Sequence, residues 1–209
     1  MIIRQQLVTG AARSVIAGRN PATYITVHET GNAGKGANAA AHANLQSRGN
    51  SRNASWHYTV DDREAVQSYA DTDRCKHAGD GSGHGNMSSI SIEICVNSDV
   101  DQMQAYRNAA ALVRTLMARH GIPLDRVVQH NRWSGKNCPT KLRAANPLSW
   151  SAFLALVSNG STTTPTTARP VPQEDDMALT DNLKVTRLDG KVHNVTVGEV
   201  LASVPTYLD

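Results

Sequence analysis

Apolar and polar residues alternate along several short stretches of the chain, which predicts strands. In residues 89–96 the pattern is clearest, because Ile90, Ile92 and Ile94 share one face and the polar or small residues between them share the other. The remaining strands are predicted over residues 24–28, 56–60 and 127–128. The chain is therefore expected to contain a sheet that buries one face of each strand.

Other stretches repeat their apolar residues at the spacing of a helix. The longest covers residues 101–120 and ends before Gly121 and Pro123, two residues that stop helices. Shorter helices are predicted over residues 37–47 and 150–157, and loops over residues 73–85 and 129–139. Strands that alternate with helices predict an α/β domain.

The composition changes near residue 159. Residues 159–175 are rich in Thr and Pro and predict a linker between a domain of residues 1–158 and a small C-terminal segment of residues 176–209. Within that segment, Asp189-Gly190 between two β-prone stretches predicts a hairpin, and residues 197–203 are compatible with a helical turn. So short a segment buries little surface alone, so it is expected to dock on a wall, on another copy or on the main domain.

Composition and charge argue against several classes of protein. The net charge is +3, but the 4% aromatic content and the lack of a Lys/Arg block argue against a nucleic-acid partner. No apolar run is long enough for a membrane span, and the N-terminal residues show no signal-peptide pattern. Three cysteines without disulfide-like spacing predict reduced thiols and folding in the cytoplasm.

The run from Gln129 to Pro139 carries the strongest chemical signal. It places His130, Lys136 and Cys138 close together on a segment too rich in Gly, Asn and Ser for a predicted helix. Imidazole and thiolate are ligands that zinc prefers, and a catalytic zinc needs three protein ligands. A nearby cation could stabilise negative charge on a substrate oxygen. The alternative is a surface loop with an incidental His and Cys.

Two residues upstream extend this hypothesis. His28 ends a predicted strand, so a sheet could bring it to His130 and Cys138, although a buried structural histidine is an equally good interpretation. Glu93 lies within the clearest strand, where a buried carboxylate is costly. It could act as a general base toward a water molecule, or it could lie on the solvent face of an edge strand.

The other histidines are weaker candidates. The loop that contains His77 and His84 could bind a metal, as some His-rich tracts do, but a substrate contact or ordinary loop chemistry is the preferred interpretation. His57 is interpreted as structural, and His42 and His120 as ordinary helix residues.

Five motifs in order give the chain a family resemblance. They are residues 25–32 (ITVHETGN), 55–62 (SWHYTVDD), 77–81 (HAGDG), 91–95 (SIEIC) and 133–139 (WSGKNCP). Over about residues 1–157 the chain resembles the zinc-dependent N-acetylmuramoyl-L-alanine amidases of the type-2 amidase family, in particular endolysins and autolysins that act on Gram-positive cell walls. The resemblance implies a central mixed β-sheet flanked by helices, as in peptidoglycan recognition proteins.

The resemblance also implies roles for individual residues. His28, His130 and Cys138 would bind one Zn²⁺, and Glu93 and Lys136 would be catalytic. The candidate substrate contacts are His77, Trp56 and Asn32. Some relatives use a catalytic tyrosine at the position of Trp56, which has no ionisable hydroxyl, and Tyr58 is not assigned that role. A mechanism based on Glu93 is therefore expected.

The resulting hypothesis is a peptidoglycan hydrolase that cleaves the amide between N-acetylmuramic acid and the L-alanine of the stem peptide. The expected setting is a bacteriophage endolysin made in the host cytoplasm, which reaches the wall through a membrane hole or on lysis. A non-catalytic peptidoglycan-binding module is the alternative, and a metal-dependent nuclease is a remote third. Self-association through the C-terminal segment is also considered.

Overall fold

The computed structural model describes residues 1–50, 52–159, 182–186 and 192–196 of the chain. Two compact units, Met1–Thr162 and Thr163–Asp209, are described separately. In the second unit, β9 (Asn182–Thr186) and β10 (Val192–Thr196) form an antiparallel pair, which agrees with the predicted hairpin. The turn itself, the helical turn expected at residues 197–203 and most of the predicted linker lie outside the described residues.

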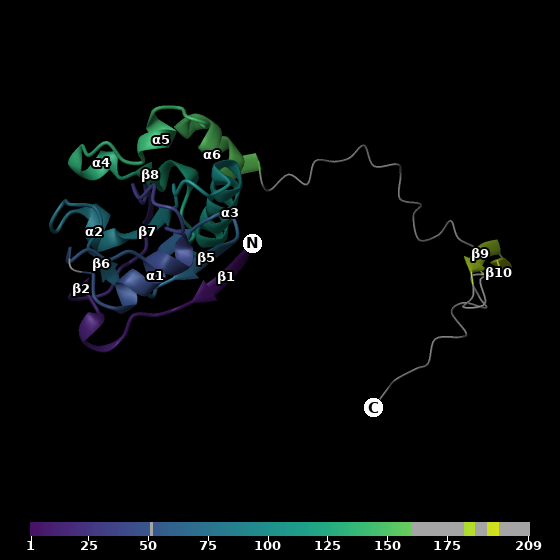
Figure 1. Cartoon of the computed structure of the whole chain (residues 1–209), viewed down its shortest axis with the longest axis horizontal. Coiled ribbons are helices and arrows are strands. Elements are labelled where there is room, and N and C mark those ends of the chain that lie inside the picture. Colours follow the sequence, from purple (N-terminus) through teal and green to yellow (C-terminus); the bar gives the residue numbers. More distant parts are fainter. Residues whose placement is uncertain (51, 160–181, 187–191, 197–209) are drawn as a thin grey trace. The chain divides into compact units, whose positions relative to one another are not determined.

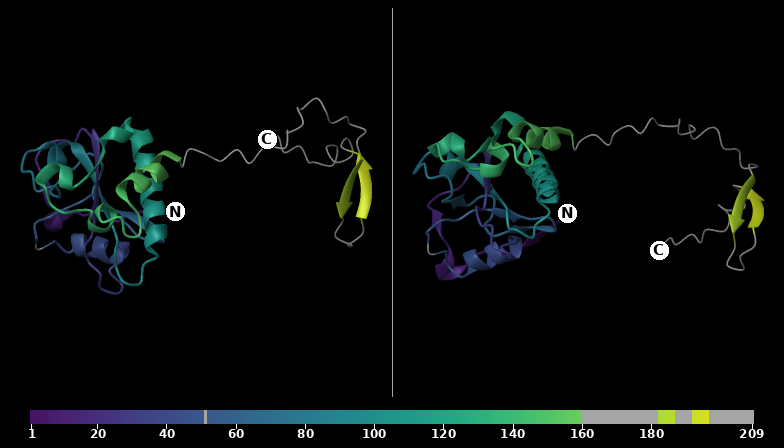
Figure 2. Two further views of the ribbon diagram at one scale, coloured as in Figure 1. Left: turned by 90° about the horizontal axis from the view of Figure 1, so that it is seen from above. Right: turned by 45° about the horizontal axis from the view of Figure 1, so that its top comes forward.

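A six-stranded sheet in the order β1-β5-β4-β7-β3-β8 forms the centre of the first unit (Figures 1 and 2). Its strands are β1 (Ile2–Gln5), β3 (Tyr24–Glu29), β4 (Tyr58–Val60), β5 (Glu64–Gln67), β7 (Ser89–Ile94) and β8 (Val127–Gln129). The sheet is mixed, because β4 and β5 pair antiparallel while the other neighbours run parallel. The pair β2 (Val15–Ile16) and β6 (Arg74–Cys75) forms a second, small antiparallel sheet.

Helices cover both faces of the main sheet, as predicted. Helix α3 (Gln102–His120) covers one face together with α6 (Trp150–Asn159), and α1 (Ala39–Ser47) packs against β4 and β5. The Asp101 carboxylate caps α3 by accepting a hydrogen bond from the Gln104 backbone, and Gly121 ends the helix at φ 66°. The shorter helices are η1 (Gly10–Ala12), α2 (His84–Ser88), η2 (Leu124–Arg126), α4 (Asn131–Ser134) and α5 (Thr140–Arg143).

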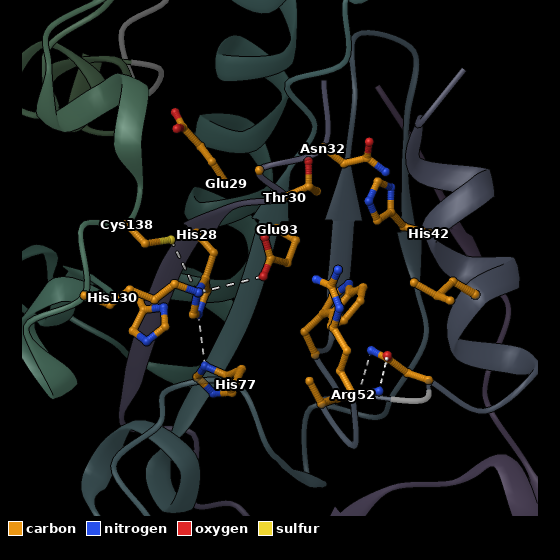
Figure 3. Close-up of a pocket in the computed structure, with 16 residues that line it drawn as sticks. His28, Glu29, Thr30, Asn32, His42, Arg52, His77, Glu93, His130 and Cys138 are labelled. Atoms are coloured by element: carbon orange, nitrogen blue, oxygen red, sulfur yellow. Dashed lines mark hydrogen bonds and ion pairs between the residues drawn. The ribbon is translucent and has the colours of Figure 1, made fainter. Parts of the chain in front are cut away.

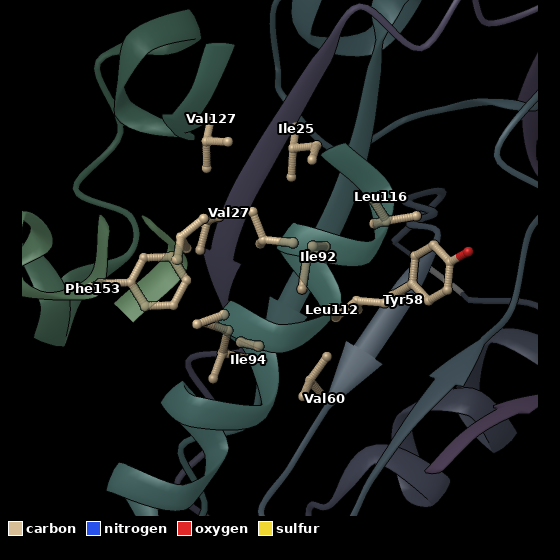
Figure 4. Close-up of a cluster of buried hydrophobic side chains, with 14 of the residues drawn as sticks. Ile25, Val27, Tyr58, Val60, Ile92, Ile94, Leu112, Leu116, Val127 and Phe153 are labelled. Atoms are coloured by element: carbon tan, nitrogen blue, oxygen red, sulfur yellow. The ribbon is translucent and has the colours of Figure 1, made fainter. Parts of the chain in front are cut away.

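The main hydrophobic core lies between the sheet and the α3–α6 face (Figure 4). Ile90, Ile92 and Ile94 of β7 are fully buried there, as their alternation predicts. They pack with Leu112 of α3 and Phe153 of α6, among others. Burying a side chain of this size stabilises the folded state by about 1.5–3 kcal/mol. The isoleucine face of β7 is therefore held in the core, and only the opposite face is available for residues of a functional site.

A buried carboxylate ties the C-terminal end of α3 to the sheet. Asp71 accepts hydrogen bonds from the Tyr58 hydroxyl (2.6 Å), His120 Nε2 (2.8 Å), Arg119 (3.1 Å) and Gln67 Nε2 (3.1 Å). Burial alone would raise the pKa of Asp71, but the hydrogen bonds from Tyr58, His120 and Arg119 outweigh it and lower the pKa. Asp71 is therefore charged and fully engaged at neutral pH.

Several predicted elements need correction. Residues 73–85 are not all loop, because they include β6 and the first residues of α2, and residues 129–139 include the one-turn helix α4. The strand predicted from Trp56 begins at Tyr58, because the Gln46 side chain binds both the N–H (3.0 Å) and the carbonyl (3.2 Å) of Trp56. Among the described residues, no helix combines the length and apolar character needed to cross a membrane.

Candidate active site

His28, His130 and Cys138 converge at the C-terminal ends of neighbouring parallel strands. Their ligand atoms lie within 4.8 Å of one another, and all three side chains are buried (Figure 3). Cys138 Sγ is 3.9 Å from His28 Nδ1. The pairing of β3 with β8 spans the long sequence separation, and the His130 backbone N–H donates to the Val27 carbonyl of β3 (3.2 Å). The sheet thus assembles the predicted cluster.

Asn131 shapes the segment that carries His130 and Cys138. Its side-chain amide donates to the carbonyls of Gly135 (2.8 Å) and Lys136 (2.9 Å), and its backbone N–H donates to the Cys138 carbonyl (3.0 Å). Gly135 ends the single turn of α4 at φ 73°. The short helix was not predicted because its stability comes from these closing hydrogen bonds and not from helix propensity.

The hydrogen bonds of the two imidazoles leave one nitrogen of each facing the cluster. His130 Nε2 donates to the Ala78 carbonyl (2.9 Å), so Nδ1 keeps its lone pair; this atom is buried without a partner among the described residues. His28 Nε2 pairs with His77 Nδ1 (3.0 Å), which leaves His28 Nδ1 facing Cys138. Burial lowers the pKa of both His28 and His130, so both are neutral, as metal ligands must be.

Glu93 lies beside the cluster. It pairs in register with His28 across β3 and β7, and its Oε1 is 3.9 Å from His28 Nδ1. Its Oε2 is buried without a hydrogen-bond partner in the described part of the chain. Burial raises the pKa of Glu93 to about 8, against the opposing effect of Lys136. Because β7 lies between β4 and β3, the alternative of an exposed edge strand is wrong.

Lys136 and Cys138 complete the predicted set. The Lys136 side chain is exposed and lines the same pocket as Glu93. Burial, followed by the nearby Glu93 carboxylate, raises the pKa of the Cys138 thiol to about 12. All three cysteines are free and buried, which agrees with the expectation of reduced thiols.

Glu29 is a site residue that the sequence reasoning missed. Its carboxylate accepts hydrogen bonds from the Tyr106 hydroxyl (2.8 Å) and from the backbone N–H groups of Lys141 (2.6 Å) and Leu142 (3.3 Å). It thereby caps α5, which begins two residues after Cys138. The sequence signal was a carboxylate directly after His28, but residue 29 was interpreted as the start of a loop instead of the last strand residue.

The cluster opens into a pocket of about 610 Å³. The predicted substrate contacts His77, Trp56 and Asn32 all line it, and His77 also holds His28. His42, interpreted from the sequence as an ordinary helix residue, lines it too. Tyr58 lies in the main core and donates its hydroxyl to Asp71, so it is not a tyrosine of the site.

The other histidines considered in the sequence lie outside the pocket lining. His84 begins α2 and packs near Tyr24, with ring centroids 6.0 Å apart. His57 is buried and pairs with the Ser91 hydroxyl (2.8 Å) and the Asp73 carbonyl (3.0 Å), which agrees with a structural role.

Comparison with known proteins finds relatives of this chain. The family model described as N-acetylmuramoyl-L-alanine amidase matches residues 18–141. N-acetylmuramoyl-L-alanine amidase XlyA of Bacillus subtilis (strain 168) is 48% identical over 141 residues, which are 68% of this chain and 46% of XlyA. N-acetylmuramoyl-L-alanine amidase CwlH of the same organism is 47% identical over 140 residues, which are 66% of this chain and 54% of CwlH.

A solved structure agrees with these matches. The catalytic domain of XlyA aligns with a TM-score of 0.70 and 43% identity, over 75% of this chain and 99% of that domain. This chain spans about half the length of the two curated relatives. The extent of the family match, together with the aligned fold, shows that the chain belongs to the N-acetylmuramoyl-L-alanine amidase family.

Proposed function

We propose that this chain is a peptidoglycan hydrolase of the endolysin type. It cleaves the amide bond between N-acetylmuramic acid and the L-alanine of the stem peptide in Gram-positive-type cell walls. The observation that carries this proposal is the unpartnered, buried Glu93 Oε2 next to the converged His28, His130 and Cys138. The names of the family and of its relatives support the choice of bond.

The three clustered residues fit one zinc ion. Two imidazoles and one thiol are a ligand set that zinc favours, and three protein ligands leave a fourth position open. A tetrahedral zinc separates an imidazole nitrogen from a thiolate sulfur by about 3.6 Å, close to the 3.9 Å between His28 Nδ1 and Cys138 Sγ. The unsatisfied, buried Nδ1 of His130 is explained if it is the third ligand.

Glu93 supplies the general base in this proposal. When bound, zinc polarises the amide carbonyl and lowers the pKa of water. Glu93 takes a proton from the attacking water and returns it to the nitrogen of L-alanine as the C–N bond breaks. Burial raises the pKa of Glu93 in the metal-free site, and a carboxyl whose pKa is shifted toward neutrality can accept a proton and then donate it.

Lys136 stabilises the negative charge that develops on the carbonyl oxygen. It lines the pocket on the same segment as Cys138 and is without an ion pair among the described residues. Asn131 fixes the backbone of this segment by binding the Lys136 carbonyl. Removing such a charge-stabilising donor costs about 10²–10³ in rate.

The test is an assay of purified cell walls for new L-alanine amino groups, with the zinc-loaded full chain. Release of amino groups by the wild type and its loss in Glu93→Gln are expected. Wall binding without any release would instead support the alternative of a non-catalytic peptidoglycan-binding module. Release of reducing sugar ends alone would contradict the proposed bond.

We also propose that residues 1–158 act as the catalytic domain and that residues 176–209, after the linker of residues 159–175, target the wall or mediate self-association. The change of composition near residue 159 supports this division. Comparing the mass in solution and the wall binding of the chain with and without residues 173–209 tests it. Unchanged mass and unchanged wall binding would contradict both roles.

A further inference from the structure

The pocket continues beyond Glu93 to a second wall that has no part in the proposed bond cleavage. This wall is built from α1 and the loop that follows it. Among its members are Leu45, Asn50, Arg52 and Trp56. Trp56 was considered as a substrate contact from the sequence, whereas nothing in the sequence pointed to Leu45, Asn50 or Arg52.

Hydrogen bonds hold this second wall in place. Gln46 binds the backbone N–H and carbonyl of Trp56, and Trp56 Nε1 donates to the Thr59 hydroxyl (2.7 Å). The Asn50 side chain donates to the Ala54 carbonyl (3.1 Å) and accepts from the Arg52 backbone N–H (3.1 Å). The Gln46 bonds tie Trp56 to α1, and the Asn50 bonds lie within the loop that carries Arg52, whose side chain is exposed.

The Arg52 guanidinium is a cation to which no residue of the described chain is paired. It makes no hydrogen bond or ion pair with any residue that the structure describes. Figure 3 shows its side chain extending into the pocket, across from His28 and Cys138. Two glutamates line the pocket, but among the described contacts neither pairs with Arg52. The Glu29 carboxylate accepts hydrogen bonds from Tyr106 and the α5 backbone, and Glu93 lies beside His28.

An apolar side chain accompanies this cation. Leu45 is 45% exposed, which places it among the few large apolar residues of the described chain that remain open to solvent. It lines the same pocket as Arg52. A fixed wall that combines an unpaired guanidinium with an exposed aliphatic side chain is complementary to a ligand with a carboxylate and a hydrocarbon portion.

We infer that this second wall is a subsite for a free carboxylate of the stem peptide, with Arg52 as its partner. The inference rests on the proposed function and deepens it by naming a feature of the substrate. Arginine binds carboxylates through two parallel hydrogen bonds, and a peptide that fills the pocket excludes water and strengthens them. Amidation removes the charge of the carboxylate and replaces one acceptor oxygen by a donor, so it weakens this contact.

Two carboxylates of a wall peptide could supply this group. One is the α-carboxylate of a second-position D-glutamate that is linked through its side chain, and the other is the free carboxylate of a third-position diaminopimelate. Both present the same chemistry to Arg52. Three synthetic muramyl peptides distinguish them: one with both carboxylates free, one amidated at the second residue and one amidated at the third.

The experiment compares kcat/KM on these three peptides for the zinc-loaded wild type, Arg52→Gln and Arg52→Lys. The matched control is Arg48→Gln, because Arg48 follows α1 but does not line the pocket. The wild type should prefer the free form over one of the two amidated forms by about tenfold or more. Arg52→Gln should lose that preference, Arg52→Lys should keep part of it, and Arg48→Gln should match the wild type.

Two results overturn the subsite while leaving the proposed function intact. One is equal cleavage of all three peptides by the wild type, and the other is an undiminished preference in Arg52→Gln. Failure of the wild type to cleave any peptide, with zinc bound, would overturn the proposed function and the subsite together. Thermal unfolding of each variant confirms that it is folded, which is expected because the Arg52 side chain loses no contact with a described residue.

Discussion

The Glu29 carboxylate accepts a 2.6 Å hydrogen bond from the backbone N–H of Lys141, which lies 112 residues further along the chain. This contact joins the strand residue that follows His28 to the helix that follows Cys138. One carboxylate therefore sets the distance between two of the three clustered side chains, without itself belonging to the cluster.

We predict that Glu29→Gln weakens metal binding. A glutamine keeps only one of the two acceptor oxygens. Its NH₂ group would face either the Lys141 N–H or the pair formed by the Tyr106 hydroxyl and the Leu142 N–H, so at least one buried donor loses its partner. The free energy of unfolding should fall by about 1–3 kcal/mol, and zinc affinity measured against a competing chelator should fall as well. Tyr106→Phe removes one donor but leaves the cap of α5, so it should destabilise the fold without changing zinc affinity. Equal zinc affinity in the wild type and Glu29→Gln would contradict this role.

Glu93→Gln should lower the rate of catalysis strongly while keeping the metal. The amide preserves the shape of the side chain but cannot take a proton, and loss of a general base costs about 10²–10⁴ in rate. Burial raises the pKa of Glu93 to about 8 in the metal-free site, and a zinc ion beside it would lower this value. Wild-type activity should therefore fall as acidification protonates this carboxylate. The residual activity of Glu93→Gln should lack that acid limb. Atomic spectroscopy should find about one zinc per chain in both proteins.

Zinc binding should release a proton from Cys138. In the metal-free site the thiol is protonated, because its pKa is raised to about 12, whereas His28 and His130 are already neutral. In the Glu93→Gln background, where Glu93 cannot contribute a proton, zinc affinity should therefore rise about tenfold per pH unit near neutrality, with about one proton released. Calorimetry in buffers of different ionisation enthalpy measures this number.

The Glu93→Gln background removes the contribution of the Glu93 carboxyl from the count of protons. In that background, Cys138→Ala should bind zinc more weakly and release no proton, because alanine has no group that ionises. Proton release that persists in this variant would exclude Cys138 as its source.

His77→Ala should lower zinc affinity about tenfold to a hundredfold. His77 Nδ1 pairs with His28 Nε2, and loss of this partner leaves the His28 ring free to rotate away from Cys138. His42→Ala is the matched control, because His42 also lines the pocket but its Nδ1 bonds the Asn38 carbonyl of its own helix. The same loss of affinity in both variants would argue against a specific orienting role for His77.

Asp71→Asn should destabilise the fold in a pH-dependent way. At pH 7 the expected loss is about 2 kcal/mol, since hydrogen bonds to a charged acceptor are weakened. Because the folded pKa of Asp71 is lowered, its contribution is complete above the ordinary value of about 3.9 and is lost as the pH falls through the folded value. Urea unfolding at pH 7 and pH 3 should show the gap between wild type and variant narrowing in acid. A constant gap would contradict the linkage.

Regular patterns made part of this fold predictable from the sequence. The alternation in β7 and the long amphipathic α3 were located to within two residues, because burial of one face dictates their periodicity. The strands β1 and β5 were missed: β1 exposes Ile2 and Ile3, and β5 is only four residues long. β1 is an edge strand and β5 lies between β1 and β4, but both are defined by pairing partners that no local pattern reveals.

The residues of the site were also only partly predictable from the sequence. Ligand chemistry and motif order indicated His28, His130, Cys138 and Glu93, and the structure brings them together. The role of Glu29 depends on a helix 112 residues away, so it could not be seen locally. The orientation of Arg52 likewise depends on Asn50 and on the three-dimensional path of a loop.

The placement of the cluster has a consequence for the edge of the sheet. Strand β8 is three residues long and pairs with β3 alone among the described strands. An ion shared by His28, His130 and Cys138 would bind residues 127–143 to the interior of the sheet. Loss of the metal and local opening of residues 127–143 would then occur together, and the backbone amides of this segment would exchange with solvent before those of β7.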